Sequence, residues 1–326
     1  IAKYGLKEIS RTEKTGLKAL KTVAGINEKE ITVTDVGFIL GPRINAAGRL
    51  GDADAAIRLL TTDNEDEAME IARYLDSENR KRQVIQGEIL KEVRSMIKRQ
   101  CLLDKDKAIV LSSPNWHQGV IGIVASKIVE EYYKPTVLIS LDGEYGKGSA
   151  RGIPSFHLYE GLRRCSELLI DFGGHKYAAG LTIKSERINE FRDHFQKIAG
   201  EMLKDEDCIP QINIDMNIKL SELDCQLVEE INKIAPFGPS NPPPFFCSKG
   251  VEIAGEPVIV GKNNGHIKME VENGTEVIDI IGFNLSHLIE GFDSSYSYDI
   301  VYTPIIRNWG GKKKVQLKLK DIRVAE

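Results

Sequence analysis

The sequence is short of the residue pairs that usually build a self-contained metal or redox site. Its six histidines form neither HxxxH nor HExxH, and its cysteines form no CxxC pair. Asp52 and Asp54 precede an alanine-rich stretch, where they are more typical of a helix N-terminus than of a metal site. The five cysteines are widely spaced: Cys101, Cys165, Cys208, Cys225 and Cys247. We therefore expect no metal ligands in this chain, and free thiols in a reducing cytoplasm.

Several other signatures are absent as well. No apolar run reaches the roughly 18 residues of a membrane-spanning helix, and no signal peptide opens the chain, so no membrane association is expected. The chain lacks the GxSxG motif of serine hydrolases and the GxGxxG or Walker pattern of nucleotide-binding loops. The net charge of −4 gives no overall attraction to nucleic acid. Local basic clusters must therefore bind any polyanionic partner.

The 326 residues are too many for one ordinary core, and their patterns divide into four parts. Residues 1–62 predict short helices, and residues 63–103 predict one long helix that Asp63 or Asn64 caps. Its apolar stripe lapses into the charged run DSENRKRQ, which is typical of a helix that spans a gap between domains. Residues 104–205 alternate strands and helices, which predicts an α/β domain. Residues 206–326 are mostly strands and predict a small closed β-barrel, with the oligonucleotide-binding fold as one candidate.

Local patterns add detail to this outline. Within the α/β part, residues 157–172 predict a helix and residues 178–183 a strand, and Ser185 is expected to cap the next helix. The chain begins at Ile1 without a methionine, from which we expect a fragment of a longer protein. A processed full-length chain is the alternative.

The run GKGSARG is the best candidate for an anion site. It holds Lys147, Ser149 and Arg151 at alternate positions, which would lie on one face of a strand. An ammonium, a hydroxyl and a guanidinium on one face suit a phosphate, because arginine can donate two parallel hydrogen bonds and lysine adds a point charge. The alternative is a solvated edge strand.

The run GPRINAAGRLG places Arg43, Asn45 and Arg49 among small residues. The two arginines could face a polyanion, whereas Asn45 could simply cap a helix.

The run PNWHQGVIG puts Trp116, His117 and Gln118 at the start of a predicted helix, where free amides favour anions. Trp116 could stack on a base or pack in the core, and the sequence leaves both interpretations open.

The run RNWGGKKKVQLK predicts a basic hairpin tip. It carries Arg307, Trp309, Lys312, Lys313 and Lys314. Such a tip is usually only solvated, but a tryptophan among basic residues in a small barrel also suits contact with nucleic acid.

The run DFGGHKYAAG sets His175 among small residues, with Gly173 and Gly174 directly before it. Small residues allow a backbone or a ligand to approach closely. The histidine could be a general base, a metal ligand, a phosphate contact or a packed turn residue. No partner ligands or nucleophile accompany it, so a phosphate contact is the favoured role and a packed turn residue the alternative.

Taken together, these runs resemble the RecJ family of single-strand-specific DNA exonucleases. The runs GPRINAAGRLGDADAAIRLL, WHQGVIGIVASKI, GKGSARGIPSFHLYEGL, DFGGHKYAAGLTI, PFGPSNPPPFF and NWGGKKKVQLKLKDIR occur in that family's order. The resemblance implies a 5′-to-3′ exonuclease of DNA repair and recombination that uses manganese or magnesium. It also implies the tail of a DHH domain, a connecting helix, a DHHA1 domain and an oligonucleotide-binding barrel.

The resemblance also implies roles for particular residues. Ser149 and Arg151 match the family's residues that receive the substrate's 5′-phosphate, and His175 matches the DHHA1 signature at the substrate cleft. Arg43, Asn45 and Arg49 match a run that lines the nuclease groove. The DHH motif and the other aspartate motifs of the metal core do not occur in this sequence.

We therefore expect this chain to bind single-stranded DNA and its 5′-phosphate but to be inactive by itself, because cleavage needs the groups that hold the metal ions. Two alternatives remain. The chain could be an interaction module for a helicase or a single-strand-binding protein, or a DHHA1 relative that acts on RNA or short oligonucleotides.

Overall fold

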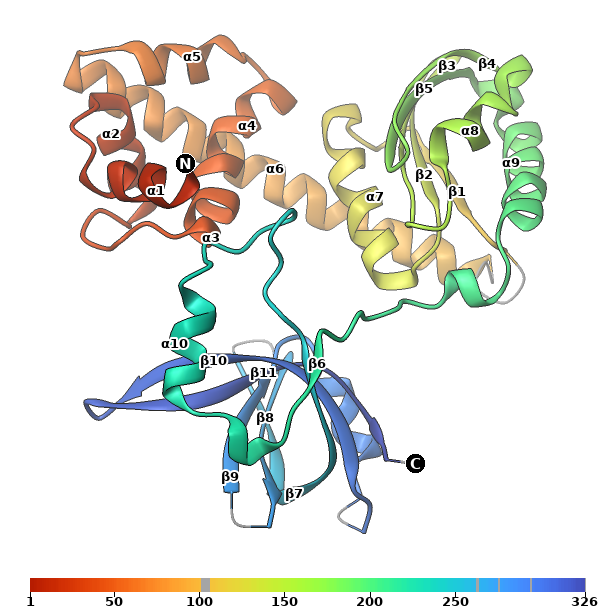
Figure 1. The fold of residues 1–326 in the computed structure, drawn as a ribbon. Helices are drawn as coiled ribbons and strands as arrows, with labels where there is room; N and C mark the ends of the chain where they lie inside the picture. The colour runs from red at the N-terminus through yellow and green to blue at the C-terminus, as the bar shows by residue number, and fades with distance from the viewer. Residues whose placement is uncertain (101–105, 262–263, 275, 294, 326) are drawn as a thin grey trace. The chain divides into compact units, whose positions relative to one another are not determined.

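The computed structural model describes residues 1–100, 106–261, 264–274, 276–293 and 295–325 (Figure 1). The chain divides into two compact units, Lys7–Gln211 and Ile212–Glu326, with Ile1–Leu6 grouped with the second. Each unit is described by itself. Cys101 and the end of the predicted long helix lie outside the described residues. Cys165, Cys208, Cys225 and Cys247 are free thiols. Across the described ranges, no helix is both long and apolar enough to span a membrane.

The first part of the chain is helical, as predicted. Gly25 ends one of these helices in the left-handed conformation, at φ 70°, where its amide donates to the helix's last carbonyls. The helices are α1 (Ala2–Arg11), α2 (Thr15–Ala24), α3 (Val33–Asp35), a π-helix (Val36–Leu40), α4 (Gly41–Leu50) and α5 (Asp54–Thr61).

The long helix α6 spans Glu65–Arg99 and begins at Asn64, whose side chain accepts a hydrogen bond of 3.0 Å from the amide of Glu67. Its charged middle differs from the expectation of a solvated span. Five polar side chains there are buried: Asp76, Glu78, Asn79, Arg82 and Gln86. Helices α2 and α4 pack against α6, so the polar run of α6 forms part of an interior.

The α/β part is a five-stranded sheet in the order β1-β2-β3-β5-β4. Only β1 and β2 pair in parallel. Helix α7 lies on one face with α6, and helices α8 and α9 cover the other face (Figure 1). The elements are β1 (Ile109–Ser113), α7 (Gln118–Tyr132), β2 (Thr136–Asp142), β3 (Tyr145–Arg151), α8 (Leu158–Arg163), β4 (Leu169–Gly174), β5 (Ala178–Lys184) and α9 (Ile188–Met202).

Two local predictions in this sheet were wrong. The helix expected over residues 157–172 ends at Arg163, and Leu169–Gly174 forms β4 because these residues pair antiparallel with β5. Tertiary pairing overrides the local pattern there. Ser185 does not cap α9, because its hydroxyl donates to the carbonyl of Gly143 instead, at 3.0 Å.

The second unit is a closed five-stranded barrel, which confirms the predicted oligonucleotide-binding fold. The strand order is β10-β11-β9-β8-β7, and pairing of β10 with β7 closes it. Gly310 and Gly311, at φ 56° and 79°, make the two-residue hairpin turn between β10 and β11. The elements are β6 (Met216–Asn217), α10 (Cys225–Asn232), β7 (Phe246–Val260), β8 (His266–Asn273), β9 (Glu276–Gly282), β10 (Tyr298–Trp309) and β11 (Lys312–Val324).

Candidate nucleic-acid interface

Strand β3 places the predicted anion-binding side chains on one face. Gly146 and Ala150 turn toward the buried side, so Lys147, Ser149 and Arg151 share the opposite face. The guanidinium of Arg151 donates to the hydroxyl of Ser149 at 3.1 Å and to the carbonyl of Ala150 at 2.7 Å. These two contacts orient the guanidinium beside the hydroxyl and leave further N–H groups of Arg151 to bind a ligand.

Helix α7 begins directly beside this pair. His117 caps it by accepting a hydrogen bond of 3.1 Å from the amide of Gly119. A Cβ atom on Gly122 would lie 2.8 Å from Ser149 Oγ and 2.9 Å from Arg151 Nη2. Glycine at this position therefore lets the first turn of the helix approach the serine and the arginine. The amides of Gly119, Val120 and Ile121 already donate to His117, so it is the positive end of the helix dipole that favours an anion here.

Two more arginines complete the cluster. The guanidinium of Arg49 donates to the carbonyl of Gly119 at 3.2 Å, and a Cβ on Gly119 would clash with the carbonyl of Arg49 at 2.2 Å. Arg82 is buried in α6 and donates to the side-chain oxygens of Gln86 and Asn79 at 2.6 and 2.7 Å. We call Arg49, Arg82, Ser149 and Arg151 the arginine cluster.

The arginine cluster carries positive charge that the chain does not neutralise. Burial, followed by the charge of Arg49, lowers the pKa of both Arg82 and Arg151. Within the described part of the chain, none of the three arginines forms an ion pair with a carboxylate. Partly buried cations that repel one another and have only neutral partners make a favourable place for an anion.

The structure separates the other predicted residues of α4 from this cluster. Arg43 donates through Nε to Asp76 at 2.9 Å and through Nη1 to the carbonyl of Ile39 at 2.7 Å. Asp76 also pairs with Arg80 at 2.8 Å. Asn45 is exposed and lies inside α4, so the alternative that it caps a helix is wrong. Of the two arginines in this run, Arg49 belongs to the arginine cluster and Arg43 pairs with Asp76 instead.

Trp116 packs in the core. Its side chain is buried at 3% exposure, and its indole N–H donates to Glu92 at 3.0 Å. Because the ring is covered, the interpretation that Trp116 stacks on a base is wrong, and the alternative of core packing holds.

His175 lies at the turn between β4 and β5. Its amide donates to the carbonyl of Ala178 at 2.8 Å, and its side chain is exposed rather than packed. Gly174 has φ 148°, and a Cβ there would lie 2.5 Å from the carbonyl of Ala178, so the tight hairpin requires glycine. Arg151 pairs with Ala178, which brings this turn next to the end of β3.

A floor of small residues leads from the arginine cluster to this turn. Across the sheet, Ser149 pairs with Gly180, and Gly180 pairs with Gly173. Gly173 and Gly180 are exposed, so the floor is open on this face. We call Gly173, Ala178 and Gly180 the small-residue floor.

The metal that the family resemblance implies does not fit the residues present. Among the residues that the structure describes, no group of three or more His, Cys, Asp or Glu side chains could hold a metal ion.

The predicted basic tip of the barrel is a regular hairpin. Lys313 pairs with Glu229 of α10 at 2.6 Å, and Arg307 donates to Gln316 at 3.3 Å. Lys312 and Lys314 are exposed. The side chain of Trp309 lies outside the described residues.

Arg82 is a member of the arginine cluster that was not predicted from the sequence. The sequence does contain a pattern that indicates its burial. The apolar stripe of α6 continues at the same helical spacing but with polar residues in its middle. The residues on this face are Leu75, Asn79, Arg82, Gln86, Ile89 and Val93. Polar residues that continue a buried stripe predict a buried polar cluster, not a solvated bridge.

Comparison with known proteins identifies the family to which this chain belongs. A family model described as the DHHA1 domain matches residues 105–201, and one described as the RecJ OB domain matches residues 214–321. A single-stranded-DNA-specific exonuclease RecJ from Bacillus subtilis is 37% identical over all of this chain. The chain belongs to the RecJ family.

Other RecJ proteins are also similar to this chain. The Haemophilus influenzae RecJ is 32% identical over 97% of this chain, which corresponds to 56% of that protein. The crystal structure of Thermus thermophilus RecJ in complex with Mn²⁺ superimposes with a TM-score of 0.83 at 28% identity, over 99% of this chain and 46% of that one. The B. subtilis match corresponds to 41% of that relative, so the chain spans about half the length of the relatives it matches.

Proposed function

We propose that this chain is the part of a RecJ exonuclease that binds the 5′ end of single-stranded DNA. The observation that supports this most is the arginine cluster, in which Arg151 donates to the hydroxyl of Ser149 and Arg49 donates to the carbonyl of Gly119 at the start of α7. In the described part of the chain, none of its three guanidiniums pairs with a carboxylate. A terminal phosphate carries more negative charge than an internal phosphodiester, so such a cluster favours a phosphorylated end.

Beyond its 5′-phosphate, the DNA strand would follow the small-residue floor toward His175. The absence of side chains on Gly173 and Gly180 lets a sugar–phosphate backbone approach the sheet. The exposed imidazole of His175 would donate to the next phosphate along the strand. Lys147, on the same face of β3 as Ser149, would add positive charge beside the terminal phosphate.

The barrel would contribute a second, less specific contact with the strand. Lys312 and Lys314 are free of carboxylate partners in the described part of the chain, whereas Lys313 would have to exchange Glu229 for a phosphate. Trp309 would stack on a base.

The whole protein would hydrolyse single-stranded DNA from its 5′ end with Mn²⁺ or Mg²⁺, in repair and recombination in the cytoplasm. Thermus thermophilus RecJ has been crystallised with both ions. The ions would be held by residues outside this chain, so the chain alone would bind DNA without cleaving it.

A substitution at the arginine cluster tests the proposal. Arg151→Ala should weaken binding of a 5′-phosphorylated strand about tenfold or more, because hydrogen bonds to a charged group contribute about 1.5–3 kcal/mol. Binding of the 5′-hydroxyl strand should change little. Arg163→Ala is the control, because Arg163 is an exposed arginine on α8 that pairs with Glu160. Equal losses on both strands would refute the role of Arg151.

A further inference from the structure

A cavity of about 630 Å³ is lined by Lys147 of β3, whose side chain lies on the same face of the sheet as Ser149 and Arg151. The start of α7 and strands β2, β3 and β5 form it. Its lining includes His117, Gln118, Asp142, Tyr145, Lys147 and Thr182. Lys147 donates to the hydroxyl of Thr182 on β5 at 2.9 Å, which fixes the ammonium in the wall of the cavity.

The cavity offers the groups that recognise a nucleoside. Tyr145 is 49% exposed, so its ring can provide a stacking surface, whereas Trp116 is buried. The carboxylate of Asp142 can accept hydrogen bonds from a base amino group or a sugar hydroxyl, and the exposed amide of Gln118 can both donate and accept. A carboxylate in the lining disfavours a second phosphate, so the occupant should be neutral where it meets Asp142.

The spacing along β3 suits one nucleotide. Side chains on one face of a strand repeat about every 7 Å, so Lys147 lies about 7 Å and Tyr145 about 13 Å from Ser149. A phosphate at the arginine cluster would therefore place an attached base within reach of the Tyr145 ring.

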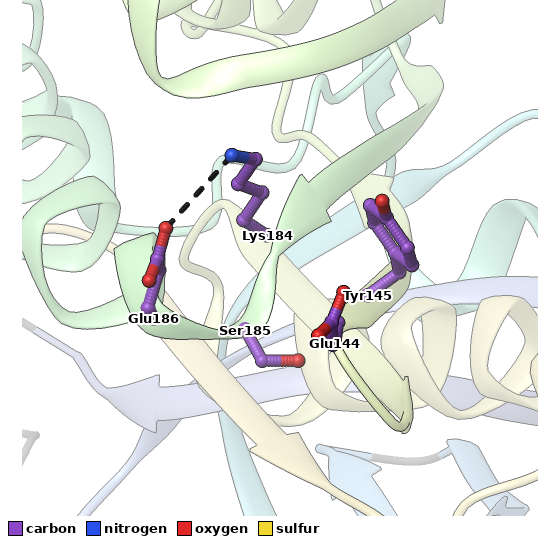
Figure 2. Close-up of a pocket in the computed structure, with 5 residues that line it drawn as sticks. All are labelled: Glu144, Tyr145, Lys184, Ser185 and Glu186. Atoms are coloured by element: carbon purple, nitrogen blue, oxygen red, sulfur yellow. Dashed lines mark ion pairs between the residues drawn. The ribbon is translucent and has the colours of Figure 1, made fainter.

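A second cavity also borders Tyr145 but has different chemistry. It measures about 420 Å³ and is lined by Glu144, Tyr145, Lys184, Ser185 and Glu186. Figure 2 shows Lys184 facing Glu186, 4.0 Å away, which leaves the carboxylate of Glu144 as the remaining charge. This cavity does not adjoin the arginine cluster and gives a nucleotide no site for its phosphate.

We propose that the larger cavity binds a free nucleoside 5′-monophosphate, with its phosphate in the arginine cluster and its base stacked on Tyr145. The proposal rests on the phosphate-binding role of the cluster. A DNA strand would use the same phosphate site but run the other way, over the small-residue floor toward His175. A mononucleotide, the kind of product that exonuclease hydrolysis releases, would then compete with the 5′ end of the strand.

Calorimetric titrations of the 326-residue chain test this with three ligands: deoxyadenosine 5′-monophosphate, inorganic phosphate and a 5′-phosphorylated oligonucleotide. Tyr145→Ala should weaken the mononucleotide roughly five- to a hundredfold, the range expected for loss of one base–aromatic stack. It should leave phosphate and the oligonucleotide unchanged, and Tyr145→Phe should restore wild-type affinity. Tyr159→Ala, which removes another partly exposed tyrosine, is the control.

The outcomes separate this inference from the proposed function. If Arg151→Ala weakens phosphate but Tyr145→Ala leaves the mononucleotide unchanged, the cavity is not a nucleoside site. If Tyr145→Ala weakens the mononucleotide and the oligonucleotide equally, the cavity holds the end of the strand, which also overturns the inference. If Arg151→Ala changes none of the three ligands, the proposed phosphate site itself is wrong.

Discussion

Gly122 lies where stability and binding should change in opposite directions. Replacing it with alanine adds a Cβ atom 2.8 Å from Ser149 Oγ and 2.9 Å from Arg151 Nη2. Both neighbours are ends of side chains that can move, so the fold should accommodate the methyl group. Alanine is favoured over glycine inside a helix by about 0.5–1 kcal/mol, and Gly122→Ala should therefore leave the melting temperature equal or raise it by about 2–4 °C.

Binding should weaken in the same variant. The displaced serine and arginine would lose hydrogen bonds to the terminal phosphate, and bonds to charged groups contribute about 1.5–3 kcal/mol. We expect affinity for a 5′-phosphorylated strand to fall about 10- to 150-fold, with little change for a 5′-hydroxyl strand. Thermal melts and fluorescence anisotropy titrations measure the two effects.

A matched control separates helix propensity from the site. Gly200 lies in α9, and a Cβ atom there would meet nothing within 4 Å. Gly200→Ala should stabilise the chain without changing DNA affinity. Unchanged affinity of Gly122→Ala for the 5′-phosphorylated strand would refute the placement of the phosphate beside Ser149 and Arg151.

Three further predictions follow from buried charges and hydroxyls. Arg82→Gln should reduce the thermal stabilisation that inorganic phosphate gives, measured for each variant against its own phosphate-free melt, because it removes a buried cation close to Arg49; unchanged stabilisation would exclude Arg82 from the site. Asp76→Ala should lower the free energy of unfolding by up to about 3–5 kcal/mol in urea titrations, because it leaves the largely buried Arg43 unpaired. A loss below about 1 kcal/mol would show that this ion pair is unimportant. Burial raises the pKa of Tyr302 to about 12, so between about pH 10 and 12 the unfolded chain loses a proton that the folded chain keeps. Stability should fall as the pH rises through that window, by up to roughly 2–3 kcal/mol, and Tyr302→Phe should flatten the fall; an equally steep fall in that variant would contradict this origin.

The sequence predicted the elements whose signals are local. Strand β3 was readable from alternating small and polar residues, and the start of α6 from Asn64. The closed barrel was expected from the density of strands after residue 206. The domain boundaries at 62, 103 and 205 stay predictions.

The features that were not predicted from the sequence share a physical cause. Each of them depends on contacts between segments that are distant in the chain. Strand β4 exists because Leu169–Gly174 pairs with β5, and its local pattern resembles a helix. Arg82 joins Arg49 and Arg151 only once α6 packs against α4 and α7. Arg43 and Arg49 are six residues apart in one run, yet Arg43 pairs with Asp76, 33 residues away, whereas Arg49 donates to the carbonyl of Gly119, 70 residues away.

Recognition of a phosphorylated 5′ end is the main function that we propose for this chain. Anisotropy titrations of the chain with two strands of identical sequence, one 5′-phosphorylated and one 5′-hydroxyl, test it most directly over a series of salt concentrations. We predict that the phosphorylated strand binds about tenfold more tightly or better at low salt, and that its affinity falls more steeply as salt rises, because more phosphate contacts release more counterions. Equal affinities and equal salt dependence for the two strands would contradict the account.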